Sequence, residues 1–292
     1  MEKVESINVN ESNSSNKNRG KYIVEAVTEK IFMISALVAV ISLLLIIGFV
    51  FYKGLMPFIA EGYSFIDFIF GTEWLPGSQK FGIGSMIVTS IVATIGALII
   101  GVPVGILAAI FIAEICPKRY AKIISTAVEL LSGIPSVLYG IFGLAIIVPA
   151  IQNVLNLPKG QSLLAVIFVL AIMMLPTIIS LSETSIRAVP KAYKEGSLAL
   201  GASKIETIFK VTVPAAKSGI LAGVILGIGR ALGETMAVIL VAGNSTAFPT
   251  SILDSVRPLT TNIALEMGYV AGTHQEMLFA TGVVLFIFII II

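Results

Sequence analysis

Long apolar runs separated by short charged stretches dominate this chain. Six such runs can be drawn, over residues 31–52, 84–113, 123–151, 163–181, 218–242 and 277–292. The first five are long enough for the ~20-residue helix that crosses a bilayer. The last stops after 16 residues in FIFIIII, so we expect the natural C-terminus to lie beyond it. The pattern predicts an all-α, polytopic transmembrane bundle of about six spans.

The polar start of the chain differs from the rest. Residues 1–20 are rich in Asn and Ser and carry little apolar surface, so burial cannot offset the entropy cost of ordering them. We therefore predict a disordered tail over 1–20 and a transmembrane domain over 21–292.

Positive charge is distributed unevenly between the two sides of the predicted bundle. The tail, the loop after the second run and the loop after the fourth run hold 14 of the 19 Lys and Arg residues, and the opposite loops hold 4. Because short cytoplasmic loops are enriched in Lys and Arg, the N-terminus and residues 190–214 are predicted to be cytoplasmic. The protein is expected to be a multi-pass protein of the plasma membrane.

Composition excludes several classes of function. The chain is 57% hydrophobic and 12% charged, with mean hydropathy +1.00 and net charge +2, so no nucleic-acid partner is indicated. A single cysteine, Cys116, excludes an internal disulfide, and a single histidine, His274, argues against a metal site. There is no GxxxxGK[ST] pattern and no catalytic residue set, so the chain is not expected to be an enzyme. If ATP is used, another chain must bind it.

The cytoplasmic loop over 190–214 has a pattern typical of two short helices. Pro190 can open the first helix, and Gly201 suits the left-handed residue that ends it. Ser203 and Glu206 have the spacing of a capping box for the second helix, which is expected to stop before Pro214.

The first of these helices carries small side chains next to a lone carboxylate. Gly196 and Ser197 follow Glu195 directly, and small residues allow close approach of another surface. The loop is therefore either a docking element for a cytoplasmic partner or a segment that packs under its own bundle. Its pattern resembles the EAA loop of binding-protein-dependent ABC importer permeases, on Glu195, Gly196, Ser197, Gly201 and Pro214. In that family this loop is the coupling helix, which seats in a cleft of the ATPase subunit.

The fifth run, GILAGVILGIGRALGETMAVILVAGN, holds a charged pair. Arg230 lies 13 residues beyond Lys217, which is ~20 Å along a helix and deep in the bilayer. Glu234 follows four residues later, and a continuous helix places both charges on one stripe with Gly219, Gly223 and Gly227. An Arg at a helix centre costs ~2.5–3.5 kcal/mol on insertion scales. We interpret the pair as part of an anion pathway; the alternative is a structural ion pair that fixes helix packing.

A second resemblance indicates which anion is transported. GRALGETMAV, LLSGIPSVLYGIFGL and FGTEWLP are similar to segments of the PstC-type permeases of phosphate ABC importers, and the similarity runs from about Ile31 onward. It implies a type I ABC importer fold, with Arg230 and Glu234 involved in phosphate translocation. It also implies a second, homologous permease subunit, two cytoplasmic ATPase subunits that bind ATP and Mg²⁺, and an extracytoplasmic phosphate-binding protein.

Other polar and small residues have candidate roles. Ser136, beside Pro135 in the third run, and Asn244, after the fifth, are candidate donors along the pathway. Gly101 and Gly105 form a small-residue face that favours a helix–helix contact. The predicted cytoplasmic borders hold three carboxylates that we expect to pair with Lys or Arg: Glu114, Glu129 and Glu183.

Three rival interpretations remain open at this point. The cargo could be another oxyanion, such as sulfate or molybdate. The chain could be a secondary transporter or channel that needs no ATPase, although no inverted repeat is evident. A polytopic membrane enzyme would require a catalytic set that the sequence lacks.

Overall fold

The computed structural model describes residues 2–291, with side chains for residue 22 and for residues 24–291. The chain divides into two units, Met1–Lys53 and Gly54–Ile292. The first unit contains most of α1 (Glu2–Ala60), whose part Val24–Ala60 is apolar and long enough to span a membrane, with mean hydropathy 2.9. The backbone of residues 2–20 continues α1, but the side chains of 1–21 lie outside the described part. The disordered tail over 1–20 therefore stays a prediction.

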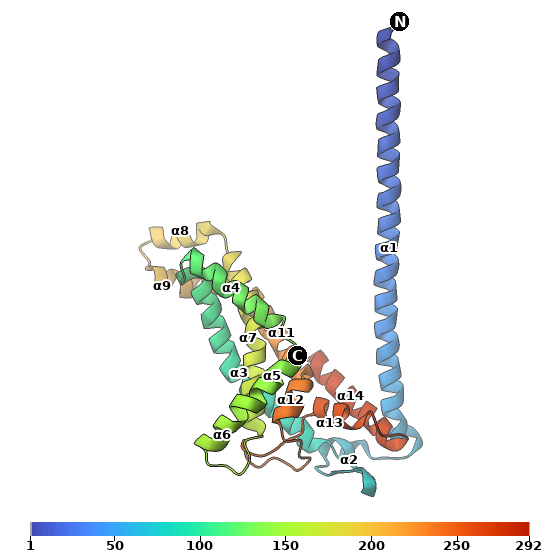
Figure 1. Cartoon of the computed structure of the whole chain (residues 1–292), viewed down its shortest axis with the longest axis vertical. Helices are drawn as coiled ribbons and strands as arrows, with labels where there is room; N and C mark the ends of the chain where they lie inside the picture. The colour runs from blue at the N-terminus through green and yellow to red at the C-terminus, as the bar shows by residue number, and fades with distance from the viewer. Residues whose placement is uncertain (1, 292) are drawn as a thin grey trace. The chain divides into compact units, whose positions relative to one another are not determined.

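The second unit is almost entirely helical (Figure 1). It begins with a short helix and a hairpin of two antiparallel strands, α2 (Phe65–Phe70), β1 (Trp74–Leu75) and β2 (Lys80–Phe81), in which Trp74 pairs with Phe81. Its long apolar helices follow: α3 (Gly84–Ile110) with the π-helical η2 (Phe111–Ile115), α7 (Leu163–Arg187), α11 (Lys217–Gly233) and α14 (Thr273–Ile291). Across both units, the described residues include five helices that are long and apolar enough to cross a membrane. A sixth is counted if the bent pair Lys204–Ala215 and Lys217–Gly233 is one span.

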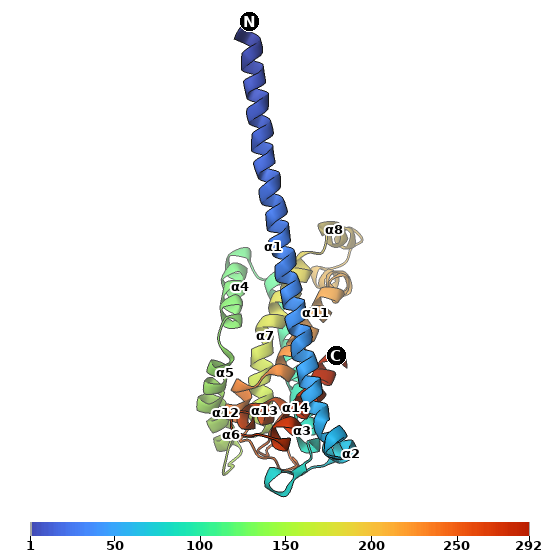
Figure 2. The same cartoon turned by 90° about the vertical axis from the view of Figure 1, so that its right-hand side faces the viewer.

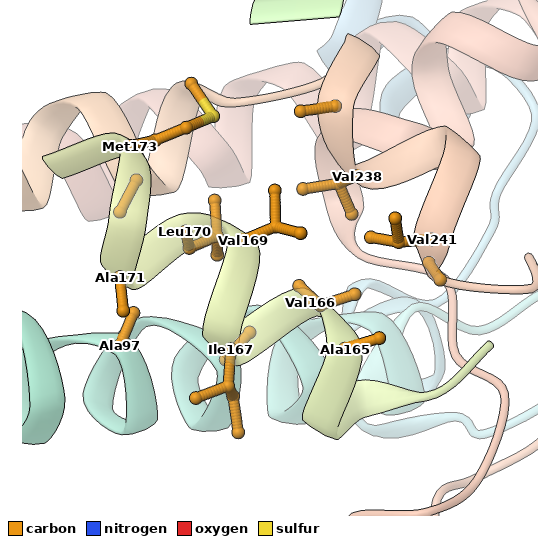
Figure 3. Packing of buried hydrophobic residues seen from close by; sticks show 14 of the residues in the cluster. Ala97, Ala165, Val166, Ile167, Val169, Leu170, Ala171, Met173, Val238 and Val241 are labelled. Carbon is orange, nitrogen blue, oxygen red and sulfur yellow. The ribbon is translucent and has the colours of Figure 1, made fainter. Parts of the chain in front are cut away.

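The core of the second unit lies around α7. Its buried face includes Ala165, Val166, Val169, Leu170 and Met173, which pack between α3 on one side and α12 (Met236–Val241) on the other (Figure 3). Most residues of α7 are buried among other helices, and the helix is apolar on nearly every face, as expected of a largely buried span.

Small residues allow α3 to approach α7 closely. A Cβ added at Gly101 would lie 2.8 Å from the Met174 sulfur, and one added at Gly105 would lie 2.7 Å from Cγ2 of Ile178. The predicted helix–helix contact at these glycines is therefore confirmed, and α7 is the partner helix.

Replacing Gly105 with leucine is expected to destabilise the bundle, because no space remains beside Ile178. Overpacking of this kind costs ~1–3 kcal/mol, so less of the variant should stay soluble in detergent after heating. Gly229→Leu is the matched control in α11, since an added Cβ there meets nothing within 4 Å. Equal thermal retention of the two variants would contradict the packing argument.

The third apolar run is divided, contrary to the single span predicted over 123–151. Helix α4 (Lys118–Ser132) ends at Gly133, and α5 (Ser136–Phe142) begins after Pro135. Helix α5 continues through the π-helical η3 (Gly143–Ile147) into α6 (Val148–Val154), so the span is Ser136–Val154. The break arises because Pro135 offers no backbone N–H and disfavours helix at the residue before it. The Tyr139 hydroxyl bridges the break by donating to the Leu131 carbonyl at 2.7 Å.

One end of the second unit is stabilised by a buried polar network. Glu266, at the end of α13 (Leu259–Glu266), accepts hydrogen bonds from Arg257 Nη1 at 2.6 Å and Trp74 Nε1 at 2.9 Å, and pairs with His274 Nε2 at 2.8 Å. The single histidine thus joins α14 to α13 and the hairpin. The four side chains hold together the loops predicted to be extracytoplasmic.

The opposite end of the second unit carries the 190–214 loop. Figure 1 shows α8 (Lys191–Ala199) and α9 (Lys204–Thr207) at the same end as the start of α4, and Figure 2 agrees. This arrangement places the loops after the second and fourth runs on one side, as the charge distribution predicts.

Candidate functional site

Arg230 lies in the last turn of α11, on a helix that uses its glycine stripe to pack against α7. A Cβ added at Gly223 or Gly227 would come within 3.1 Å of Leu181 or Ile178, so the predicted close-approach face is confirmed. Leu221 and Ile225, on the opposite face, are exposed, as expected for a surface in contact with lipid.

Arg230 is only partly buried, and its guanidinium is lightly held, which means that it forms few and weak contacts with the described residues. Its Nη1 donates to the Thr177 hydroxyl of α7 at 3.5 Å, which is a long and weak hydrogen bond. Among the described side chains no carboxylate forms an ion pair with Arg230. Most of its donors therefore remain available for an anion.

The prediction that Arg230 and Glu234 lie on one stripe of a continuous helix is wrong. Helix α11 ends at Gly233, and Glu234 has extended backbone angles, with φ −71° and ψ 133°. The Glu234 carbonyl accepts from the Thr260 hydroxyl at 2.8 Å, and its carboxylate accepts from the Ala237 N–H of α12 at 3.1 Å. These bonds take the place of the backbone hydrogen bonds that a continuing helix would form. The carboxylate of Glu234 therefore does not lie on the stripe that a continuous helix predicts.

Glu234 instead lines a small cavity with polar residues that sequence reasoning missed. The other polar lining residues are Ser90 and Thr94 of α3 and Thr260 of α13. Ser90 accepts a hydrogen bond from the Leu259 N–H at 3.1 Å, which fixes the start of α13 against α3. The i, i+4 spacing of Ser90 and Thr94 within an apolar run was the only signal of this lining in the sequence.

Ser136 and Asn244 occupy different surroundings. Ser136 is partly buried in the first turn of α5. Asn244 has a left-handed φ of 61°, and its side chain donates to the Ile239 carbonyl at 2.9 Å. Its own carbonyl accepts from Arg257 Nε at 2.9 Å. Asn244 therefore closes the turn after α12, and its part in the pathway stays a prediction, as does that of Ser136.

The cytoplasmic loop adopts the predicted helix, glycine turn and helix. Gly201 has φ +86°, which a residue with a side chain rarely adopts. Ser203 and Glu206 form the capping box in both directions. The backbone and hydroxyl of Ser203 hold the pKa of the Glu206 carboxyl below its usual value. The Ser197 and Thr207 hydroxyls lie 3.0 Å apart and join α8 to α9.

The end predicted for the second helix is wrong. Instead of stopping before Pro214, the helical run continues through the π-helical η4 (Ile208–Thr212) into α10 (Val213–Ala215). Pro214 lies in the first turn of α10, where its missing N–H costs little.

The outer face of α8 is available for contact. No residue of α8 is buried, and Glu195 is exposed. A Cβ added at Gly196 meets nothing within 4 Å. An open, largely apolar groove runs beside it, lined by Ala192, Tyr193, Gly196, Ser197, Leu200, Ala202 and Val211.

A membrane-spanning bundle with a lightly held guanidinium in its interior and an exposed helical elbow at one end defines a transport permease. The sequence pattern of the binding-protein-dependent transport system inner membrane component family matches residues 101–292. The chain belongs to this family, and it is a multi-pass protein of the bacterial inner membrane. As a permease it is a transport component and is not itself catalytic.

Similar proteins agree with this assignment. The chain is 40% identical over 282 residues to the probable ABC transporter permease protein YqgH of Bacillus subtilis. This alignment covers 94% of this chain and 89% of that protein. It is 34% identical over 286 residues to the phosphate transport system permease protein PstC of Mesorhizobium japonicum, covering 90% and 86%. The PstC of Xylella fastidiosa (strain Temecula1) is 36% identical over 241 residues, covering 76% of this chain and 74% of that protein.

Solved structures show the same fold. A bacterial alginate ABC transporter, in complex with an alginate-bound periplasmic protein, aligns with TM-score 0.55 and 19% identity over 87% of this chain and 92% of that chain. The inward-facing MetNI methionine ABC transporter aligns with TM-score 0.52 over 72% of this chain and 88% of that chain. The described part of the chain therefore has an ABC importer permease fold.

Proposed function

We propose that this chain is the membrane subunit of an ATP-driven importer of inorganic phosphate. The observation that carries the proposal is the lightly held guanidinium of Arg230, in a chain whose relatives named for phosphate transport are 33–36% identical to it. A guanidinium offers paired, planar donors that match phosphate oxygens. Because no described carboxylate neutralises Arg230, an arriving anion does not have to displace one.

The partners follow from the proposed mechanism. Phosphate is delivered outside by a separate binding protein and passes between this chain and a homologous second permease. Two cytoplasmic ATPase subunits bind ATP and Mg²⁺, and their closure moves the α8–α9 elbow. That movement biases the bundle between two states. The open groove beside Gly196 supports docking of a partner at this elbow.

The pathway in this chain runs past three groups. The polar cavity at Ser90, Thr94, Glu234 and Thr260 supplies a polar lining, whose three hydroxyls donate to the backbone carbonyls of Met86, Ser90 and Glu234. Arg230 supplies the charge. The Glu234 carboxylate repels an anion, so it would prevent phosphate from binding too tightly to leave. Ser136 and Asn244 are further donors of this pathway in the proposal.

Competition between oxyanions tests the cargo. In cells that depend on this importer for phosphate, uptake of labelled phosphate should be unaffected by a tenfold excess of sulfate or molybdate. Purification of the chain from the same membranes should bring the ATPase and the second permease with it. Strong competition by sulfate would assign another oxyanion, and a transport-active chain with no ATPase partner would indicate a channel or secondary transporter.

A further inference from the structure

The π-helical segment η2, at the end of the span formed by α3, receives two cations from other elements. Arg187, in the last turn of α7, donates from Nη2 to the Ile112 carbonyl at 3.1 Å. Lys194, in the middle of α8, forms an ion pair with Glu114. The π-helical turn η2 ends the span at Ile115, and it is the meeting point of that span and the cytoplasmic elbow.

The Lys194–Glu114 pair is more buried than the other Lys–Glu pairs of the second unit. The Lys194 and Glu114 side chains are 24% and 12% exposed, whereas those of Lys210 and Glu206, in the same loop, are 75% and 50% exposed. Exposed pairs contribute little to stability, but breaking a buried pair leaves an uncompensated charge. Since no residue of α8 is itself buried, this pair is a principal attachment of α8 to a membrane span.

A second set of polar contacts continues the attachment into the bundle. Arg187 Nε donates to Glu183 Oε1 at 2.9 Å, and the Ser125 hydroxyl of α4 donates to the same oxygen at 2.8 Å. Through Ile112 and Glu114, η2 is thus connected to α7 and α8, and Glu183 connects α7 to α4. The expected pairing of Glu114 and Glu183 with cations is confirmed, whereas Glu129 is exposed and forms no ion pair among the described residues.

We propose that Glu114 is a positioning residue that transmits movement of α8 to the spans α3 and α7. The inference rests on the proposed function, because it assumes that a partner moves α8. When α8 is pushed, the buried pair obliges η2 to follow, and the Arg187–Ile112 contact extends the displacement to α7. Without the pair, α8 still receives the push and stays joined to α7 through residues 188–190, but η2 is no longer obliged to follow it.

This role predicts an uncoupled transporter rather than an unfolded one. In the complete complex in proteoliposomes, Glu114→Gln should leave assembly and ATP hydrolysis within twofold of wild type. Phosphate transported per ATP hydrolysed should fall at least fivefold. Lys194→Gln should behave in the same way, and the double variant should be no worse than either single variant, because all three remove one interaction.

A charge swap separates coupling from folding. Glu114→Lys with Lys194→Glu restores the pair in reverse, so at least half of the wild-type coupling ratio should return. Glu129→Gln, which removes an exposed carboxylate of α4, is the matched control and should match wild type. Additive losses in the double variant, or no rescue by the swap, would overturn the inference.

The test also separates this inference from the proposed function. If the wild-type complex transports phosphate and Glu114→Gln transports as much phosphate per ATP hydrolysed, only the positioning role fails. If wild type itself transports no phosphate, the proposed function fails first.

Discussion

Replacing Arg230 with alanine is expected to abolish phosphate uptake while the complex still assembles. A hydrogen bond to a charged group contributes ~1.5–3 kcal/mol, and ~1.4 kcal/mol corresponds to a tenfold change. Loss of two guanidinium donors should therefore reduce uptake at least about 100-fold. Folding should be little affected, because the only hydrogen bond of this side chain to the described residues is the 3.5 Å contact with Thr177. Initial rates of labelled phosphate uptake, normalised to the amount of complex, provide the measurement.

Two further variants make this result specific. Arg230→Lys keeps the charge but loses the planar pair of donors, so its uptake should lie between wild type and the alanine variant. Arg119→Ala removes an exposed arginine from the first turn of α4 and should transport normally. Normal uptake by Arg230→Ala would exclude an anion pathway past this residue.

Replacing Gly196 with leucine is the second change with a large expected effect. Within this chain the new side chain has open space, since an added Cβ meets nothing within 4 Å, and leucine favours helix more than glycine does. Any loss must therefore come from a partner that needs a small residue at this place. We expect the ATPase subunits to be absent from the purified complex, or reduced at least tenfold.

Alanine at the same position is the control. Gly196→Ala keeps the surface small, so the ATPase should co-purify in normal amounts. If Gly196→Leu also assembles with the ATPase and supports normal hydrolysis, α8 is not the docking helix. A loss in both variants would point to a need for glycine itself rather than for a small surface.

Local features of the fold were predictable because their causes lie within a few residues. The left-handed turn at Gly201 and the capping box of Ser203 and Glu206 depend on neighbouring backbone groups alone. The glycine stripe of α11 also packs as predicted, because regular helix periodicity holds as far as Arg230. The Gly101 and Gly105 contact follows from small size at a helical spacing.

The break at Gly233 and Glu234 could not be predicted in the same way. It is held by Thr260, which is 26 residues further along the chain, and by the N–H of a helix that begins only after the break. A helical wheel assumes that the helix continues and has no means of detecting these contacts. The polar cavity was missed for the same reason, because it forms only where α13 meets α3 at Ser90.

The effects of two prolines on helix continuity differ from the prediction in opposite directions. Pro135 lies within the single span predicted over 123–151, but it separates α4 from α5 completely, with Gly133 nearby to end the first helix. Pro214 was expected to stop a helix, but the π-helical turn before it changes the register so that the run continues. Whether a proline ends a helix depends on the hydrogen bonds of the preceding turn, which the sequence does not specify.

Transport by the purified complex in proteoliposomes tests the central claim most directly. Vesicles would contain this chain with its second permease and ATPase subunits, with the binding protein and labelled phosphate on one side and ATP on the other. The account predicts phosphate accumulation that requires ATP, is resistant to excess sulfate, and is lost with Arg230→Ala. Accumulation without ATP, or unchanged accumulation in the Arg230→Ala complex, would contradict it.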